Sequence, residues 1–172
     1  IEAKRTASSP DAGRHQAWLY ANALESIYGQ RPLIFYTNGY RTYLWDDTFY
    51  SLPRRVYGFY TRDELRWAIQ KRNTRLDLCL RKGSDSQVQK VDVDPNIAGR
   101  PYQLEGIQRV AESLVTFEQG TGKLRGAKRH ALMVMATGSG KTRVSATIVD
   151  VLFRANWVKR VLFLADRNAL VT

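Results

Sequence analysis

The sequence predicts an α/β chain whose later part contains a parallel β-sheet, and two observations carry the α/β prediction. Residues 131–136 form a continuously apolar run, a glycine-rich loop follows, an amphipathic segment begins at Lys141, and a second apolar run covers 161–165. Strand, helix and strand in that order form a right-handed βαβ unit whose strands are covered on both faces. In addition, two strand-like stretches flank Asn38-Gly39, a hairpin signal because both central residues of a two-residue turn take positive φ.

The first seventy residues predict a strand, a helix, a hairpin and a second helix. The opening residues 1–4 resemble the end of a buried strand, and residues 13–28 predict a helix with Gly29 just past its end. The hairpin strands are expected over 33–37 and 40–45. Thr61 and Glu64 fit a capping box, so a helix is expected to start there and to run to about residue 72. The apolar face of the first helix is expected to contain Ala17, Tyr20, Leu24, Ile27 and Tyr28.

The later residues predict a helix, a basic loop and the βαβ unit. Residues 73–98 lack periodicity and are interpreted as a linker. The expected helices run from residue 102 to about 118 and from 141 to about 156, with a basic loop over 120–130. We therefore expect three parts with these boundaries: 1–72, 73–98 and 99–172.

Composition narrows the function without deciding it. The chain has 172 residues and a formal net charge of +11, with a net of +4 in residues 1–98 and +7 in residues 99–172. Such an excess suggests a polyanionic partner such as nucleic acid, although a solvated basic surface explains it equally well. The single cysteine, Cys79, excludes a disulfide within the chain and fits the reducing cytoplasm. No apolar run approaches the roughly 18 residues of a membrane span, so no membrane partner is expected.

The strongest motif is a phosphate-binding loop between the predicted strand 131–136 and the predicted helix after it. Its glycines let backbone N–H groups face phosphate oxygens, and the positive end of the helix points to the same place. The lysine can reach the outer phosphates of ATP, and the threonine hydroxyl can coordinate Mg²⁺. The alternative is a glycine-rich turn without a ligand. The loop residues are Thr137, Gly138, Ser139, Gly140, Lys141 and Thr142.

The loop resembles motif I of superfamily 2 helicases and translocases, because Met135 stands where simpler phosphate loops have glycine. The nearby Gly-Thr-Gly-Lys of residues 120–123 lacks a following Ser or Thr and is interpreted as a basic loop. Upstream, Arg-Pro-Tyr-Gln resembles the Q-motif, which implies that Gln103 reads the adenine edge with its amide. Downstream, Leu-Ala-Asp-Arg resembles motif Ia, which implies that Arg167 contacts the DNA backbone. The alternatives are an ordinary exposed glutamine and an ordinary loop charge.

A second candidate site lies at the start of the chain. Glu2 and Lys4 form an E-x-K triplet, and the period of a strand places both on one face. A carboxylate there can hold Mg²⁺, while an ammonium group can polarise a phosphate or orient water. Gln16 and Tyr20 lie one turn apart on the next predicted helix. The alternative is a solvated glutamine beside a tyrosine that packs under the sheet.

E-x-K followed by Q-x-x-x-Y resembles one branch of the PD-(D/E)xK nucleases. The order of motifs then resembles the R (restriction and motor) subunit of type I restriction enzymes over most of the chain, including residues 1–6, 43–47 and 97–103. This resemblance implies the C-terminal part of a nuclease fold followed by the start of a RecA-like P-loop motor domain. It also implies ATP-driven translocation of double-stranded DNA coupled to Mg²⁺-dependent cleavage, with specificity and methylation subunits as partners.

The resemblance also implies missing parts. An upstream nuclease acid and the acidic motor motif II do not occur between residues 1 and 172, so we expect a piece of a longer polypeptide that is inactive alone. Two other functions remain open: another nuclease–helicase fusion, such as a type III restriction subunit, or a non-catalytic DNA-binding or assembly module with a vestigial phosphate loop.

Overall fold

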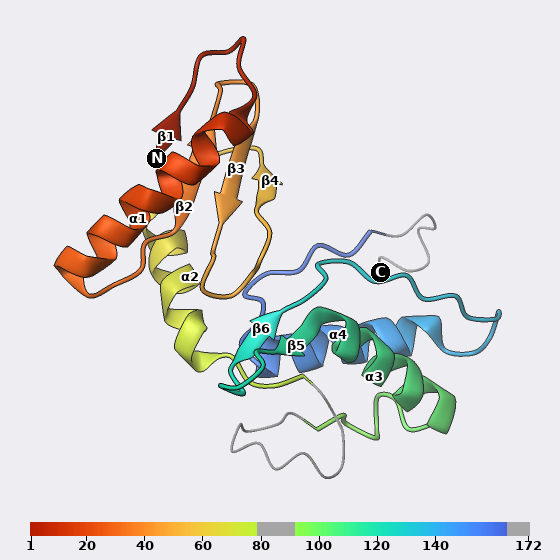
Figure 1. Ribbon diagram of the computed structural model, residues 1–172. Helices are drawn as coiled ribbons and strands as arrows, with labels where there is room; N and C mark the ends of the chain where they lie inside the picture. The colour runs from red at the N-terminus through yellow and green to blue at the C-terminus, as the bar shows by residue number, and fades with distance from the viewer. Residues whose placement is uncertain (79–91, 165–172) are drawn as a thin grey trace. The chain divides into compact units, whose positions relative to one another are not determined.

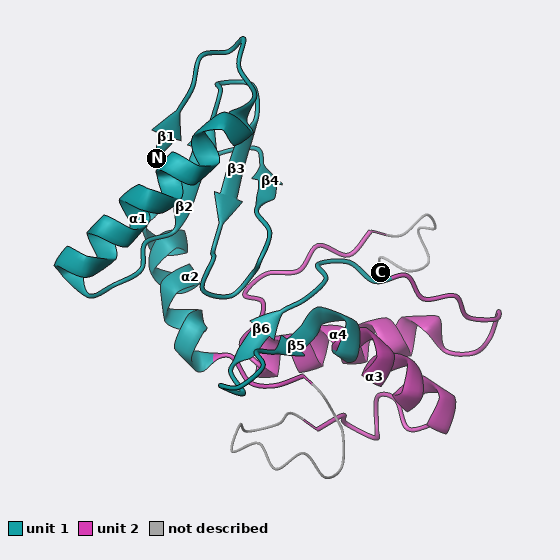
Figure 2. Cartoon of the chain, viewed as in Figure 1, with its two compact units in different colours: residues 1–74, 112–131 teal, residues 75–111, 132–172 magenta. Residues whose placement is uncertain are grey.

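The computed structural model describes residues 1–78 and 92–164. The chain forms two compact units, which are coloured separately in Figure 2. Unit 1 comprises residues 1–74 and 112–131, and unit 2 comprises residues 75–111 and 132–172. Each unit is described by itself.

Unit 1 is built on a four-stranded mixed sheet in the order β1-β2-β3-β4 (Figure 1). The first strand is parallel to β2, and the other neighbours are antiparallel. The predicted opening strand and the predicted hairpin are therefore confirmed, but the opening strand is not buried as expected, because Ile1 and Ala3 are exposed. The elements of this part are β1 (Glu2–Ala3), the 3-10 helix η1 (Pro10–Gly13), α1 (Arg14–Tyr28), β2 (Ile34–Thr37), β3 (Thr42–Trp45), β4 (Arg54–Val56) and α2 (Arg62–Thr74).

Alternate residues of the sheet supply two separate apolar clusters, as the period of a strand requires. On one face, Tyr36 is fully buried and packs with Ala17 and Ala21 of α1. On the other face, Phe35 and Leu44 pack with residues that include Leu65 of α2. The sheet thus lies between two helices.

The expected apolar face of α1 is only partly correct. Ala17 is buried, but Tyr20, Leu24, Ile27 and Tyr28 remain between 43% and 74% exposed. The lengths give a reason, since a 15-residue helix is about 22 Å long and a four-residue strand about 13 Å. The C-terminal half of α1 has no sheet of matching length to cover it.

The Asn38-Gly39 turn differs from the predicted two-residue type. The last pair of the hairpin is Thr37 with Thr42, which leaves four residues in the loop. Only Gly39 takes a positive φ, of 89°. The side-chain oxygen of Asn38 instead accepts the backbone N–H groups of Tyr40 and Arg41 at 3.2 and 3.0 Å. An asparagine side chain can replace a backbone acceptor in this way, so the turn does not need a second left-handed residue.

Both predicted helix ends in unit 1 are confirmed. Gly29 ends α1 with a φ of 67°, and its N–H donates to the Glu25 carbonyl at 2.8 Å. The N–H of Thr61 donates to the Glu64 carboxylate at 2.9 Å, and the N–H of Glu64 donates to the Thr61 hydroxyl at 3.3 Å. This reciprocal pair is a capping box.

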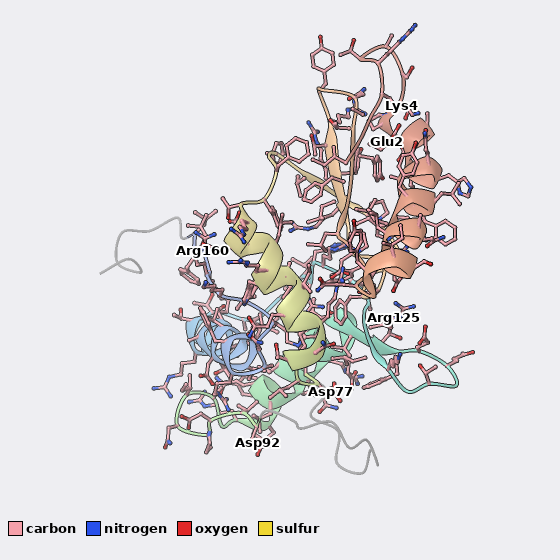
Figure 3. The ribbon with its side chains drawn as sticks, turned by 90° about the vertical axis from the view of Figure 1, so that its left-hand side faces the viewer. Glu2, Lys4, Asp77, Asp92, Arg125 and Arg160 are labelled. Carbon is pink, nitrogen blue, oxygen red and sulfur yellow. The ribbon has the colours of Figure 1, made fainter. Side chains whose placement is uncertain are left out.

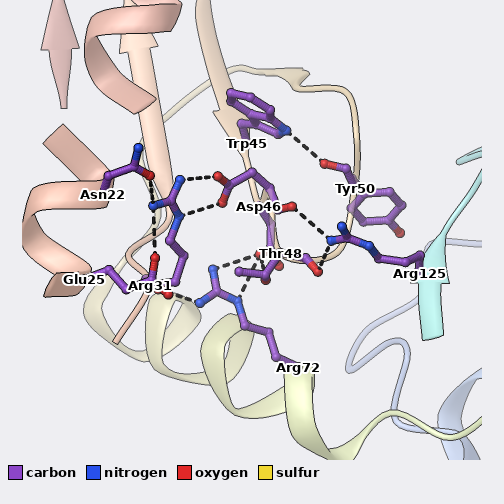
Figure 4. Close-up of polar contacts among 10 residues, drawn as sticks. Asn22, Glu25, Arg31, Trp45, Asp46, Thr48, Tyr50, Arg72 and Arg125 are labelled. Carbon is purple, nitrogen blue, oxygen red and sulfur yellow. Dashed lines mark hydrogen bonds and ion pairs between the residues drawn. The ribbon is translucent and has the colours of Figure 1, made fainter. Parts of the chain in front are cut away.

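Two arginines hold the elements of unit 1 together (Figure 4). The Arg31 side chain is 8% exposed and donates to Asp47, to Asn22 and to Glu25. The hydrogen bond to Asp47 is the main cause that raises the pKa of Arg31. Arg72 of α2 donates to the Arg31 carbonyl at 2.5 Å and pairs with Asp46 at 2.8 Å. The cluster therefore connects α1, α2 and the end of β3.

The predicted helix 102–118 ends earlier than expected. The helix α3 (Pro101–Leu114) is followed by the strand β5 (Val115–Phe117), which pairs with β6 (Leu124–Gly126) inside the predicted basic loop. The N–H of Gly126 donates to the Phe49 carbonyl at 2.9 Å, so this ribbon belongs to unit 1. Long-range pairing of this kind overrides the local helical pattern.

Unit 2 contains residues 101–111 of α3, the helix α4 (Lys141–Arg154) and a small core of Ala98, Ile107 and Val144. The predicted helix after the glycine-rich loop is confirmed. The indole of Trp157 donates to the Leu76 carbonyl at 2.9 Å, which ties residues after α4 to the start of the unit.

The predicted βαβ unit is wrong for the described residues. Residues 131–136 and 161–164 form no strand, and residue 165 lies outside the described part of the chain. Leu132, Val134, Leu162 and Leu164 are 81% to 91% exposed. A buried strand needs neighbouring strands to bind its N–H and C=O groups, and the described part of unit 2 contains none. The apolar pattern predicted burial but could not supply the strands that would provide it.

The three predicted parts, 1–72, 73–98 and 99–172, follow motifs and composition, whereas the two units follow packing. The units separate after Thr74, but residues 112–131 pack with unit 1. Much of the predicted linker, including Cys79, lies outside the described residues. The domain boundaries therefore stay a prediction.

Every helix within residues 1–78 and 92–164 is too short or too polar to span a lipid bilayer.

The arginine cluster predicts a large effect on stability. Arg31→Ala leaves Asp47, whose side chain is 11% exposed, without its main partner. Loss of one member of a buried ion pair lowers the free energy of unfolding by about 3–5 kcal/mol. Urea denaturation of the full-length protein measures the change. Arg66→Ala is the matched control, because its pair with Asp63 is exposed and exposed pairs contribute about 0–1 kcal/mol. Equal effects of the two substitutions would contradict the assignment.

Candidate functional sites

The four predicted nuclease residues lie in one chain of polar contacts in unit 1. The Lys4 ammonium is 3.0 Å from the Glu2 carboxylate and donates to the Gln16 side-chain oxygen at 2.8 Å. The Gln16 amide nitrogen donates to the Tyr20 hydroxyl at 2.6 Å. Figure 3 labels Glu2 and Lys4 beside the first helix of the chain. The structure brings together side chains from β1 and α1 that are up to 18 positions apart in sequence.

Two structural features place these groups. The parallel pairing of Glu2 with Tyr36 fixes the register of β1 against β2. The N–H of Lys4 extends this pairing by donating to the Thr37 carbonyl at 2.8 Å. The helix α1 places Gln16 and Tyr20 one turn apart on one face.

Gly13 is part of this site, although the sequence interpretation gave it no role there. A Cβ atom on Gly13 would lie 3.0 Å from Cγ of Glu2 and 3.3 Å from Cε of Lys4. The absence of a side chain at Gly13 therefore lets the backbone of η1 lie close to the side chains of Glu2 and Lys4. The sequence pointed to Gly13 only as the start of a predicted helix, and not as a residue of this site.

The contacts of Lys4 leave one of its N–H donors available for a ligand. An ammonium group has three N–H donors, and Lys4 contacts two acceptors, one on Glu2 and one on Gln16. The Lys4 side chain is 29% exposed and the Glu2 side chain 14%. The remaining donor can therefore bind a phosphoryl oxygen or a water molecule. Among the described residues, no three His, Cys, Asp or Glu side chains are grouped so that they could hold a metal ion. Of the four predicted nuclease residues, Glu2 is the one whose side chain can coordinate Mg²⁺ through a carboxylate.

The second candidate site is the loop before α4 in unit 2. Gly138 and Gly140 have φ values of 76° and 87°, in the left-handed region that favours glycine. Gly140 is the N-cap of α4 and provides no side-chain hydrogen bond to the first turn. The first amides of a 14-residue helix therefore lack a side-chain acceptor, an arrangement that suits an anion such as phosphate.

Lys141 folds back over the loop. Its ammonium donates to the Met135 and Ala136 carbonyls at 3.2 and 3.1 Å. One of its three donors remains for a phosphate oxygen. Thr142 is exposed in the first turn of α4, where its hydroxyl can reach a cation bound to the phosphates. The backbone and the polar side chains of the loop therefore fit the phosphates of ATP.

Gln103 contacts the loop itself. It is 3% exposed, its amide nitrogen donates to the Ser139 carbonyl at 3.0 Å, and its oxygen accepts the Arg100 N–H at 3.3 Å. A Cβ atom on Gly140 would lie 2.5 Å from that amide nitrogen and would displace it, and the φ of 87° at Gly140 is strained for any other residue. Each end of the amide has one further hydrogen-bonding position for a base edge.

Tyr102 is a second contact that the sequence interpretation missed. Its hydroxyl donates to the same Ser139 carbonyl at 3.0 Å and accepts from the Arg100 guanidinium at 3.0 Å. Beside these residues, Gly106, Met133 and Met135 help to line a pocket of about 400 Å³. This volume lies in the usual range of ligand pockets. Arg167, the predicted DNA contact, lies outside the described residues.

Comparison with known proteins shows a similarity to restriction enzymes. Residues 96–172 match the family described as "Type III restriction enzyme, res subunit", a helicase-like family. The chain is 39% identical to the type I restriction enzyme EcoAI endonuclease subunit of Escherichia coli over 72 residues, which are 42% of this chain and 8% of that subunit. The chain resembles the endonuclease subunits of type I restriction enzymes.

The EcoKI endonuclease subunit of Escherichia coli (strain K12) is 34% identical over 71 residues, which are 41% of this chain and 5% of that subunit. The chain therefore spans less than a tenth of the length of either subunit. These alignments are shorter than the resemblance expected over most of the chain. No solved structure is significantly similar.

The Tyr102 contact predicts a specific effect on nucleotide binding. Tyr102→Phe removes a hydrogen bond to the candidate phosphate-binding loop, so ATP and GTP should both bind about fivefold more weakly, as expected for one hydrogen bond. Equilibrium titration of the full-length protein with both nucleotides measures this. Unchanged affinities, or a loss restricted to ATP, would show that Tyr102 does not act through the loop.

Proposed function

We propose that the chain forms the nuclease–motor junction of a type I restriction endonuclease subunit. In this proposal, ATP-dependent translocation of double-stranded DNA is coupled to Mg²⁺-dependent cleavage of unmethylated foreign DNA. The observation that carries it is the presence, in one chain, of the Glu2–Lys4–Gln16–Tyr20 contacts in unit 1 and a phosphate loop in unit 2. The similarity to restriction-enzyme subunits supports it.

The proposed nuclease roles follow from the contacts. Glu2 holds Mg²⁺, and Lys4 holds the scissile phosphate or orients the attacking water. Gln16 orients the ammonium through its oxygen, and Tyr20 fixes the Gln16 amide. Bound Mg²⁺ would supply charge neutralisation at the phosphate. The proposed fold of this part is that of the PD-(D/E)xK nucleases.

The proposed motor roles use the second loop. The amides around Gly138, Ser139 and Gly140 bind phosphates together with Thr137, Lys141 contacts the outer phosphates, and Thr142 contributes to Mg²⁺. Gln103 contacts the adenine edge with the hydrogen-bonding positions that the loop leaves open. Arg167 contacts the DNA backbone. The RecA-like assignment rests on the loop, on α4 and on the family match, and not on parallel strands.

The proposed partners follow from the same similarity. Specificity and methylation subunits would choose the DNA site, while this chain would contact DNA without reading its sequence. A cytoplasmic location belongs to the proposal because of the single cysteine.

A type III restriction subunit is the second candidate. The description of the family that matches residues 96–172 favours it, whereas the relatives named above favour type I. The sequence on either side of this chain separates the two, chiefly the acidic motor motif and the place of the nuclease. A module with a vestigial phosphate loop is the third candidate. A complete lack of ATP affinity, with and without Mg²⁺, would favour it.

Two lysine substitutions test the proposal in the full-length protein. Lys4→Ala should reduce DNA cleavage by at least about 10²-fold, as expected for a group that stabilises a transition state, and leave ATPase activity intact. Lys141→Ala should abolish ATP-dependent translocation and the cleavage that depends on it. A gel-based cleavage assay and a phosphate-release assay provide the two measurements.

Lys159→Ala is the matched control, since it removes an exposed lysine of unit 2 outside both sites. Cleavage at the wild-type rate by Lys4→Ala would refute the nuclease assignment. Unchanged ATP hydrolysis by Lys141→Ala would refute the motor assignment.

A further inference from the structure

The edge strand β4 of unit 1 carries two exposed arginines, Arg54 and Arg55. Adjacent strand residues point to opposite faces, so these side chains flank the edge of the sheet. Within the described residues, neither arginine forms an ion pair with a carboxylate. Arg54 instead donates to the Tyr60 hydroxyl, and its guanidinium lies 5.8 Å from the centre of that ring. Arg55 lies 5.1 Å from the centre of the Tyr57 ring.

A third arginine joins this surface from the segment after β6. Arg129 donates to the Leu52 carbonyl at 2.8 Å, and its guanidinium lies 3.9 Å from the centre of the Tyr50 ring. Burial is the main cause that lowers the pKa of Arg129, and repulsion from Arg54 adds to it. Asp46 and Tyr50 offset part of this, but the Asp46 carboxylate is already paired with Arg72.

These contacts hold the three guanidinium groups without neutralising them. A guanidinium has five N–H donors, and the partners of Arg54, Arg55 and Arg129 are neutral hydroxyl, carbonyl and ring groups. Positioned, unneutralised arginines bind phosphate oxygens strongly because both oxygens of a phosphate can be contacted at once. The surface is therefore suited to a polyanion.

The register of the sheet relates this surface to the first candidate site. Glu2 pairs with Tyr36, Tyr36 with Tyr43, and Tyr43 with Arg55, so Glu2 and Arg55 lie at the two ends of one row across the sheet. The Tyr36 and Tyr43 rings between them are stacked at 5.2 Å. Figure 1 shows β1 and β4 at opposite edges of the sheet. Three strand spacings separate them, or about 14 Å.

The row itself cannot hold a duplex, because Tyr36 in its middle is fully buried under α1. Arg55 nevertheless lies on the same sheet as the candidate nuclease residue Glu2, whose proposed substrate is DNA. Duplex DNA is thus the polyanion that the observations favour.

We propose that Arg54, Arg55 and Arg129 form a binding site for the phosphodiester backbone of duplex DNA. The inference rests on the proposed function, because it takes DNA as the substrate of this chain.

The test is the salt dependence of DNA binding by the full-length protein. The double variant Arg54→Ala/Arg55→Ala is titrated against a short duplex by fluorescence anisotropy, without ATP or Mg²⁺, at several salt concentrations. Each lost phosphate contact lowers the slope of log affinity against log salt by about 0.9, so a fall of about 2 is expected, with roughly tenfold weaker binding. Arg129→Gln should lower the slope by about 1.

The double variant Arg62→Ala/Arg66→Ala is the matched control, because it removes two exposed arginines of α2 and the same charge. Equal slopes for the two double variants would overturn the proposal, and the test stands even if Arg129→Gln fails to fold. Unchanged DNA binding together with lost subunit assembly would also overturn it, in favour of an acidic protein partner.

Failure of the proposed function is separable from failure of this inference. DNA binding without ATP or Mg²⁺ requires neither cleavage nor translocation. A wild-type protein that binds DNA with the expected slope change but never cleaves it would refute the nuclease assignment and leave the arginine site standing. A protein that cleaves DNA but shows no slope change would refute the arginine site alone.

Discussion

The buried pairing of Arg31 with Asp47 is the interaction on which the arrangement of unit 1 depends. A buried charge is tolerated only when it is paired and hydrogen-bonded, and Arg31 meets this requirement with groups from α1 and from the end of β3. Arg72 then ties α2 to the Arg31 carbonyl and to Asp46. Because each arginine must keep its partners, the two helices cannot move independently of the sheet.

The geometry of the candidate nuclease site depends on these arginine contacts, because they fix α1 against the sheet. Lys4 meets Gln16 only if α1 keeps its position relative to β1, because their contact joins two elements. Gly13 adds a steric condition, since a Cβ atom there would lie 3.0 Å from Cγ of Glu2 and 3.3 Å from Cε of Lys4, and both side chains would have to shift slightly. The ordering of the four polar groups is therefore a property of the packed unit as well as of the motif. In unit 2, the contact of Gln103 with the Ser139 carbonyl likewise depends on tertiary packing, because it joins α3 to the glycine-rich loop.

The accuracy of sequence prediction differs between elements for physical reasons. The Gly29 helix end and the Thr61–Glu64 capping box were predictable, since each depends on residues within one or two turns. The grouping of Glu2 with Lys4 was also predictable from the strand period, whereas Gly13 and Tyr102 were not. Their importance arises from close approaches to residues distant in sequence, which no local pattern encodes.

The sequence by itself determined the local features: the positions of the helices, the hairpin, the glycine-rich loop and the residue types at the two candidate sites. The tertiary structure alone decided which apolar segments are covered and which distant groups meet. Residues 131–136 are apolar but form no strand, because strands exist only where other backbone groups complete their hydrogen bonds. The row from Glu2 to Arg55 likewise exists only through strand register, since pairing between strands is a contact that a single segment cannot specify.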